Sequence, residues 1–216
     1  MVTVPSRPTR PSHTYLRDQR ALAEARTLCP ARSHVLVSLD VKWLEHDTET
    51  ILELGLATLD LRPGFLRPAR YPPSTWAIRA RHFIISENRN VFNSRRTGKK
   101  FGFKFGKSYI CRLQKAVDAV NETFSHYPAE QVALVGQFIN QDLKILRGLG
   151  VEIPETWPVF DVANLDRADA EEVNGRRRGL AVICEELEVK YYRKDKLGNA
   201  GNDAWFAMAA FAAMCT

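Results

Sequence analysis

Cysteine, histidine and long apolar stretches are all scarce in this chain of 216 residues. The four cysteines are far apart, none belongs to a C-x-x-C pair, and no histidine cluster lies beside them. We therefore expect reduced thiols and no structural zinc site. The most apolar stretch, residues 204–214, is too short to cross a bilayer, and the chain begins without the apolar core of a secretory signal. These absences predict an intracellular protein, cytoplasmic or nuclear, with no membrane partner. The arginine-rich start leaves a mitochondrial location as an alternative.

Length and composition predict one folded domain preceded by an extension. A chain with 45% hydrophobic and 26% charged residues, at this length, suits one well-buried α/β domain and is short for two. Residues 1–12 are rich in Pro, Ser, Thr and Arg, so we expect a partly disordered N-terminal extension over residues 1–32, with a helix over 14–28. The domain itself is expected over residues 33–216.

The order of the expected elements predicts the fold class. Apolar and β-branched runs predict strands over 34–40, 51–60, 77–85, 131–135 and 157–160. Apolar residues at helical spacing predict helices over 108–127, from Asn140, over 178–187, and from Asn202 to near the end. Three antiparallel strands followed by alternating helices and strands indicate a mixed five-stranded sheet with helices on both faces.

A basic segment lies between the third strand and the first long helix. Residues 89–107 contain seven Lys or Arg residues and no acid, with aromatic residues between the cations. Cations beside rings suit the backbone and bases of a single strand, so the candidate contacts to single-stranded RNA or DNA are Arg95, Arg96, Lys99, Lys100 and Lys104. The alternative is a solvated loop held by its aromatic residues. A second cluster, residues 176–178, is expected to be a solvated loop rather than a phosphate contact.

Three aspartates occupy related places along the chain. Asp40 ends the first strand, Asp142 falls in the first turn of the helix after the fourth strand, and Asp203 opens the last helix. Each alone is explained by the frequency of Asp at strand ends and helix starts. Together they are expected to converge at one edge of the sheet, where carboxylates hold divalent ions for phosphodiester cleavage.

The segments around these aspartates resemble the three motifs of the DEDDh 3′–5′ exonucleases. Asp40-Val41-Lys42 resembles the Asp-x-Glu motif, residues 135–142 (VGQFINQD) resemble "VGHN…D", and residues 198–204 (GNAGNDA) match "HNAGNDA" in six of seven letters. Residues 52–55 resemble the "E-I-G" strand that follows the first motif. Residues 103–108 resemble the segment of phenylalanine and glycine that precedes the first long helix in a fungal branch of the superfamily. The likeness covers residues 34–214 and implies a ribonuclease H-like fold.

The positions at which this chain differs from these motifs are those to which the resemblance assigns catalytic or metal-binding roles. Lys42 stands where the resemblance implies a metal-binding Glu, Gly198 where it implies the general-base His, and Gln137 where it implies a further His. Exchanging Glu for Lys changes the local charge by two units, on the order of 10 kcal/mol against a divalent ion at ~5 Å and an effective dielectric of ~20. We therefore expect Asp40, Asp142 and Asp203 to bind metal weakly or not at all. No cofactor is expected to bind tightly, with Mg²⁺ or Mn²⁺ only if residual activity exists.

Several interpretations stay open at this point. The first is a degenerate exonuclease-like domain that binds nucleic acid, in which Lys42 pairs with the aspartates or, alternatively, contacts a phosphate. The second is a working Mg²⁺- or Mn²⁺-dependent 3′–5′ exonuclease with an altered site, in which Glu45 or Glu53 replaces the missing base. The third is a protein-interaction module with a protein partner, in which the cleft is structural only.

Overall fold

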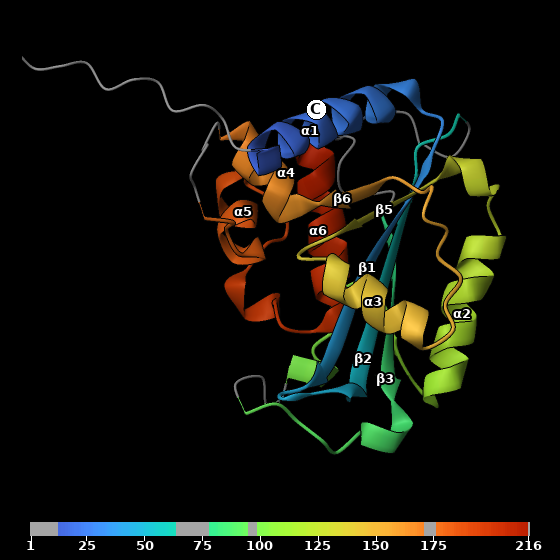
Figure 1. The fold of residues 1–216 in the computed structure, drawn as a ribbon. Helices are drawn as coiled ribbons and strands as arrows, with labels where there is room; N and C mark the ends of the chain where they lie inside the picture. Colours follow the sequence, from blue (N-terminus) through green and yellow to red (C-terminus); the bar gives the residue numbers. More distant parts are fainter. Residues whose placement is uncertain (1–12, 64–77, 95–98, 171–175, 216) are drawn as a thin grey trace, which may run out of the picture.

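The computed structural model describes residues 13–63, 78–94, 99–170 and 176–215, which form one sheet covered by helices (Figure 1). The strands are β1 (Val35–Leu44), β2 (Asp47–Asp60), β3 (Arg79–Ile85), β4 (Ser108–Cys111), β5 (Val132–Gly136) and β6 (Val159–Asp161). The helices are α1 (His13–Ala31), α2 (Leu113–Ser125), α3 (Asn140–Gly148), α4 (Val162–Asp169), α5 (Leu180–Glu186) and α6 (Ala200–Met214).

The sheet is mixed, and its strand order is β4-β3-β2-β1-β5-β6. β1 and β3 each pair with β2 in antiparallel orientation, while β5 is parallel to β1 and β6 is parallel to β5. β1 therefore lies between β2 and β5, and it continues beyond its last pair with β5, Ser38 with Val135, to Leu44. This arrangement confirms the predicted α/β class, with three antiparallel strands followed by parallel ones.

The sheet contains six strands rather than the expected five, because β4 forms where the sequence predicted the start of a helix. Ser108–Cys111 pairs in parallel with His82–Ile85, and the helix begins only at Leu113. Ile110 continues the helical spacing of α2 toward the N-terminus, but its side chain is exposed on the edge strand. Residues 108–111 form a strand because β3 offers backbone hydrogen bonds to them. This is a tertiary contact, which the spacing of apolar residues in the sequence does not reveal.

Each face of the sheet is covered by its own layer of helices (Figure 1). One hydrophobic core contains α2 and α3, and the other contains α1, α4, α5 and α6. α6 is buried on nearly all sides, which explains its apolar sequence. Within the described residues, we find no helix with the length and apolarity required to span a bilayer.

The start of α6 rests directly on the sheet at Gly55. A Cβ atom at this glycine would lie 1.9 Å from the carbonyl oxygen of Ala200, closer than any real contact. A residue without a side chain is therefore needed for α6 to approach β2. This approach brings the first turn of α6, with Asp203, to the edge where β1 carries Asp40.

Helix α1 packs against the domain, although it belongs to the stretch expected as an N-terminal extension. Leu22, Ala25 and Leu28 join the α6-side core, and Asp18 forms a buried ion pair with Arg167 of α4. The C-terminus of the chain lies beside this helix (Figure 1). The disorder expected for residues 1–12 lies outside the described residues, and the domain boundary at residue 33 stays a prediction.

We expect Leu22→Ala to lower the free energy of unfolding by about 2–4 kcal/mol, because it leaves a cavity under α1 where the side chain is 3% exposed. Leu16→Ala, on the same helix but 45% exposed, should change it by less than about 0.5 kcal/mol. Urea denaturation of both variants measures the difference. Equal, small losses would mean that α1 is a dispensable appendage.

Candidate functional site

The three predicted aspartates lie in one cleft, each contributed by a different element. Asp40 comes from β1, Asp142 from the first turn of α3, and Asp203 from the first turn of α6. The cleft encloses about 670 Å³. The prediction that Asp40 ends its strand is wrong, because β1 continues to Leu44 and Asp40 lies two residues beyond the last β1–β5 pair, Ser38 with Val135. The three acids nevertheless line the same cleft, as the sequence predicted.

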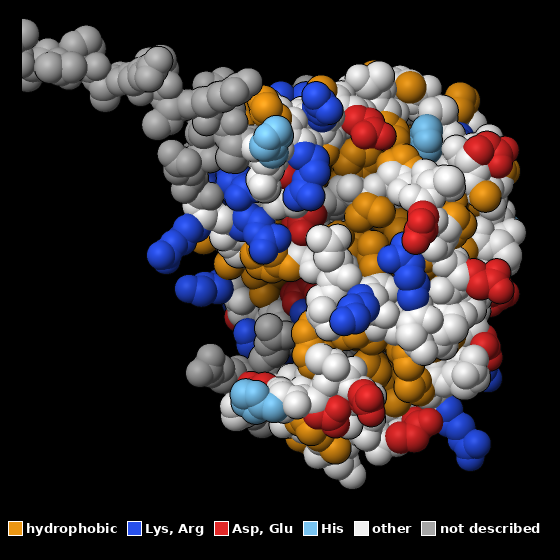
Figure 2. Space-filling view, in the orientation of Figure 1, with side chains coloured by type: hydrophobic (Ala, Val, Ile, Leu, Met, Phe, Trp, Pro, Cys, Tyr) orange, Lys and Arg blue, Asp and Glu red, His pale blue; other side chains and the backbone are white. Residues whose placement is uncertain are grey.

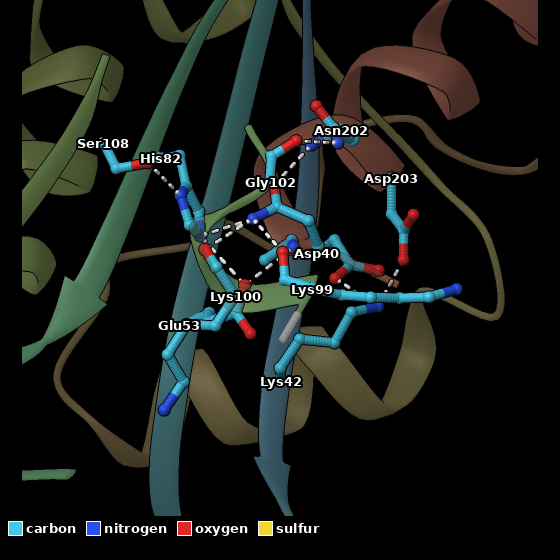
Figure 3. Close-up of polar contacts among 12 residues, drawn as sticks. Asp40, Lys42, Glu53, His82, Lys99, Lys100, Gly102, Ser108, Asn202 and Asp203 are labelled. Atoms are coloured by element: carbon cyan, nitrogen blue, oxygen red, sulfur yellow. Dashed lines mark hydrogen bonds and ion pairs between the residues drawn. The ribbon is translucent and has the colours of Figure 1, made fainter. Parts of the chain in front are cut away.

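Lys42 lies between two of these carboxylates. Its Nζ atom is 2.7 Å from Asp40 Oδ2 and 2.7 Å from Asp203 Oδ2, with only 10% of the side chain exposed (Figure 3). Lys42 follows Asp40 by two residues on β1, so both side chains point to the same face of the sheet. The ammonium group therefore occupies the space between two carboxylates that resemble metal ligands.

The residues present do not fit a pair of divalent ions. Among the described residues, no group of three or more His, Cys, Asp or Glu side chains is arranged to hold a metal. A divalent ion near Asp40 and Asp203 would also have to displace the Lys42 ammonium or bear its repulsion. The two carboxylates instead find their neutralising charge inside the protein.

Asp142 differs from the other two aspartates in its protonation. Burial in the cleft floor, and secondarily the nearby Asp40 carboxylate, raise the pKa of Asp142 to about 8, although Lys42 and the backbone of Val41 act in the opposite direction. Asp142 is therefore mostly protonated at neutral pH. The cleft then contains one ammonium against two carboxylates, a smaller imbalance than three ionised acids would give.

Gly198 has a backbone conformation that opposes the histidine implied at this position. Its φ is 93°, in the left-handed region, and a Cβ atom there would lie 2.9 Å from Cδ of Lys99. The Gly198 N–H group donates a hydrogen bond to Asp203 Oδ1 at 2.9 Å. Gly198 therefore orients the Asp203 carboxylate, and the stem of Lys99 covers the place where a side chain would begin.

Gln137 and Glu53 do not replace the missing groups. The Gln137 amide donates to the carbonyl oxygen of Arg178 at 2.8 Å, which ties it to the segment before α5. Glu53 is buried, where its Oε2 atom accepts a hydrogen bond from the Ala200 N–H at 3.1 Å and lies 2.9 Å from His82 Nε2. Glu53 thus holds the start of α6 against the sheet rather than facing the cleft.

Glu45 remains the nearest acid with access to the cleft. It lines the cleft, and its Oε2 atom accepts a hydrogen bond from the Ser94 hydroxyl at 2.8 Å. It belongs to the exposed turn between β1 and β2. Glu45 is therefore an exposed acid at the rim of the cleft, oriented by the Ser94 hydroxyl.

Lys100 is a structural residue, which corrects its prediction as a nucleic-acid contact. It is buried, and its Nζ atom donates to the carbonyl oxygens of Val91 at 2.6 Å and Asn88 at 3.0 Å. The charge of the segment predicted that Lys100 would be exposed to solvent, but the backbone around Asn88 and Val91 covers its ammonium group. Of the other candidates, Lys99 is half-buried above Gly198 and Lys104 is exposed, while Arg95 and Arg96 lie outside the described residues.

Two asparagines of the third motif hold this basic segment, a role that sequence reasoning missed. Asn199 Nδ2 donates to the carbonyl oxygen of Lys100 at 2.9 Å, and Asn202 Nδ2 donates to that of Gly102 at 3.0 Å. Asn202 also accepts a hydrogen bond from the Lys104 N–H at 2.9 Å, and its contact with Gly102 is drawn in Figure 3. The sequence did contain a signal for this role. Asparagine side chains cannot act as acids or bases, so their presence in the motif could have indicated hydrogen bonds to the backbone of another segment.

The family comparison agrees with this geometry. Residues 35–214 match the model of the family described as DNA polymerase III subunit epsilon-like, C-terminal domain. The match includes every element of the sheet and all three motif segments.

Curated relatives and a solved structure extend the comparison. In Saccharomyces cerevisiae, the uncharacterised protein YDR514C is 25% identical over 84% of this chain and 41% of its own length. From the same organism, Good for full DBP5 activity protein 2 is 25% identical over 91% of this chain and 37% of its own length. The chain thus spans about two fifths of these relatives. The RNase domain of the yeast Pop2 protein is similar in fold, with a TM-score of 0.50, 13% identity, and 95% of this chain and 88% of that chain covered.

We expect Lys42→Met to lower the free energy of unfolding by roughly 3 kcal/mol, because it leaves Asp40 and Asp203 facing each other without a cation. Mn²⁺ should then raise the melting temperature of the variant but not that of the wild type, since only the variant offers a vacant cation position. Differential scanning fluorimetry measures both effects.

Lys144→Met is the matched control, because this lysine is exposed and its removal should have little effect. An equal Mn²⁺ response in the wild type would contradict the role of Lys42 as the neutralising charge.

We expect Asp142→Asn to stabilise the protein increasingly between pH 4 and pH 8. The unfolded chain loses this proton near the ordinary pKa of 3.8, whereas the folded one keeps it to about 8, so wild-type stability falls as pH rises through this window. The gain should approach about 1.4 kcal/mol for each pH unit, as seen in urea denaturation curves. Glu155→Gln, at an exposed position, is the control. A variant less stable than the wild type at pH 8 would contradict the protonation assigned to Asp142.

Proposed function

Because the chain belongs to the family of DNA polymerase III subunit epsilon-like C-terminal domains, we propose that it is a degenerate DEDDh-type 3′–5′ exonuclease domain that binds nucleic acid without hydrolysing it efficiently. The observation that carries the proposal is the Lys42 ammonium, 2.7 Å from both Asp40 and Asp203. The fold and the cleft of an exonuclease are present, and its charge arrangement is replaced.

Two requirements of phosphodiester hydrolysis are unmet by the residues in the cleft. Divalent ions that activate water and stabilise the leaving oxygen lack a full set of ligands, because the Lys42 ammonium already contacts two of the three carboxylates. Gly198 provides no general base, a loss worth about 10²–10⁴ in rate. The remaining groups can bind a phosphate, but they do not provide what its efficient hydrolysis requires.

Binding of nucleic acid is supported by the charges around the cleft. Lys and Arg side chains gather over α4 and α5, next to hydrophobic side chains (Figure 2). Lys104 is exposed on the basic segment, and Arg176 and Arg177 are exposed just before α5, whose residues Leu180 and Ala181 line the cleft. A single strand of RNA or DNA satisfies both the charges and the apolar cleft walls.

A protein-interaction module is the second candidate function. Strand β4 forms one edge of the sheet that the described residues build, and its Tyr109 and Ile110 are 52% and 48% exposed. The name of one relative, Good for full DBP5 activity protein 2, describes a protein that supports the activity of another. An accessory role of that kind suits a domain without catalysis.

We expect the wild-type protein to retard 5′-labelled single-stranded RNA or DNA in a gel at low salt and to leave it uncut after incubation with Mn²⁺. Binding should weaken steeply with added salt, because cations contact the phosphates. A ladder of shortened products that disappears in Asp40→Ala would establish catalysis. No retardation of either nucleic acid would favour the protein-interaction module instead.

The triple variant K42E/G198H/K99A tests the same proposal by gain of function. Lys99 is included because its Cδ atom lies 2.9 Å from the Cβ position of a residue at 198. Mn²⁺-dependent cleavage by the triple variant, absent from K99A alone, would indicate that the substrate path is intact.

A further inference from the structure

An aromatic residue of the cleft wall, Phe138, adopts a strained backbone conformation. Phe138 lies in the turn between β5 and α3, with φ at 55° and 42% of its surface exposed. A left-handed conformation is uncommon for any residue other than glycine and is a genuine outlier for a bulky side chain. The protein therefore keeps a large apolar ring, partly exposed to solvent, in a conformation that disfavours it.

The motif that this segment resembles has a residue at this position that is better suited to a left-handed backbone. The motif "VGHN" has Asn at the position of Phe138, and Asn adopts the left-handed region several times more readily than most residues. The turn itself is fixed by Asp161 of β6, whose Oδ1 atom accepts hydrogen bonds from Phe138 N–H at 3.2 Å and Ala163 N–H at 3.0 Å. The backbone suits Asn, and the ring is an addition that folding does not explain.

A guanidinium group lies over the Phe138 ring. The Arg177 Cζ atom is 4.8 Å from the ring centroid, and Nη1 is 3.9 Å from Asp161 Oδ2. The next residue, Arg178, is instead held by both oxygens of Asp166 at 2.6 and 2.8 Å. Arg177, with 45% of its side chain exposed, instead lies over Phe138, which lines the cleft, and the Asp161 carboxylate orients it.

The surroundings of Phe138 limit what can bind beside it. Leu180, Leu197 and Trp43 also line the cleft, so a flat apolar face is accommodated. The volume of about 670 Å³ is that of a pocket for a small molecule or one nucleotide. An arginine over an aromatic ring both extends the stacking surface and supplies a positive charge for a phosphate.

We propose that Phe138 and Arg177 form a stacking site for an unpaired nucleobase of a single-stranded nucleic acid. This inference rests on the proposed function, because it names how the same cleft would hold its ligand. The base would lie against the ring, while its phosphate would lie toward Arg177 and its neighbour Arg176. The cleft would then bind any base without regard to its identity, since every base has a flat face that can stack.

The test compares dT12 with an abasic oligonucleotide of the same length and charge, by fluorescence anisotropy at fixed salt. The wild type should bind dT12 roughly 10- to 100-fold more tightly than the abasic strand. Phe138→Ala should lose this preference while keeping its affinity for the abasic strand, and Phe138→Trp should retain it. Tyr109→Ala, which removes an exposed ring outside the cleft, should behave as the wild type.

Stability supplies a second measurement, which a merely structural Phe138 would not satisfy. Phe138→Asn should melt at the same temperature as the wild type or higher, because it relieves the left-handed strain, yet it should bind dT12 as weakly as Phe138→Ala. Destabilised Phe138→Asn with unchanged binding would overturn the inference.

The outcomes separate this inference from the proposed function. If the wild type binds both oligonucleotides equally, only the phosphate backbone is held, so the stacking site is wrong and nucleic-acid binding survives. If it binds neither, both are wrong. A peptide ligand displaced from the cleft by Phe138→Ala, without binding of dT12, would assign the site to a protein partner.

Discussion

The cleft depends on one interaction, the contact of the Lys42 ammonium with the carboxylates of Asp40 and Asp203. The fold places these acids together whether or not anything neutralises them, because residues of β1, α3 and α6 line the same cleft. Without a cation between them, the carboxylates would repel across a few ångströms of partly dehydrated space. Lysine resolves most of this conflict from within the chain, and the raised pKa of Asp142, caused first by burial, reduces the remaining excess of negative charge without removing it.

The third motif contains two kinds of residues, which the structure separates. Asn199 and Asn202 hold the basic segment by its backbone, while Ala200 meets Glu53 and packs on Gly55. None of these contacts depends on catalysis. The one letter of the motif that differs, Gly198, is the one whose role in the resemblance is to accept a proton. A motif can therefore match closely through residues that hold the fold together, even where the residue assigned to proton transfer differs.

Much of the fold could be predicted from the sequence, because the apolar pattern of each strand matches its buried place in the sheet. The apolar runs of β1, β2 and β5 were visible, and the convergence of Asp40, Asp142 and Asp203 was predicted from their places along the chain, although β1 continues beyond Asp40. Other features depend on partners distant in sequence. β4 exists only because β3 offers it an edge, and Lys100 is buried only because Asn88 and Val91 fold back over it. The pKa of Asp142 likewise depends on its depth in the cleft, and a sequence does not specify depth.

The changes in the cleft are consistent with each other as a set of charges. An exonuclease site with four carboxylates is balanced only when divalent ions are bound, so its geometry depends on the supply of metal. Here Lys42 replaces one acid and satisfies two others, so the cleft keeps its shape without an ion. Gly198 fits the same arrangement, because its N–H group holds the Asp203 carboxylate that Lys42 pairs with. The affinity of such a cleft for a strand should be insensitive to Mg²⁺ except through screening of phosphate. That independence distinguishes a binding domain from an enzyme that is merely impaired, since an impaired enzyme would still need the metal to organise its site.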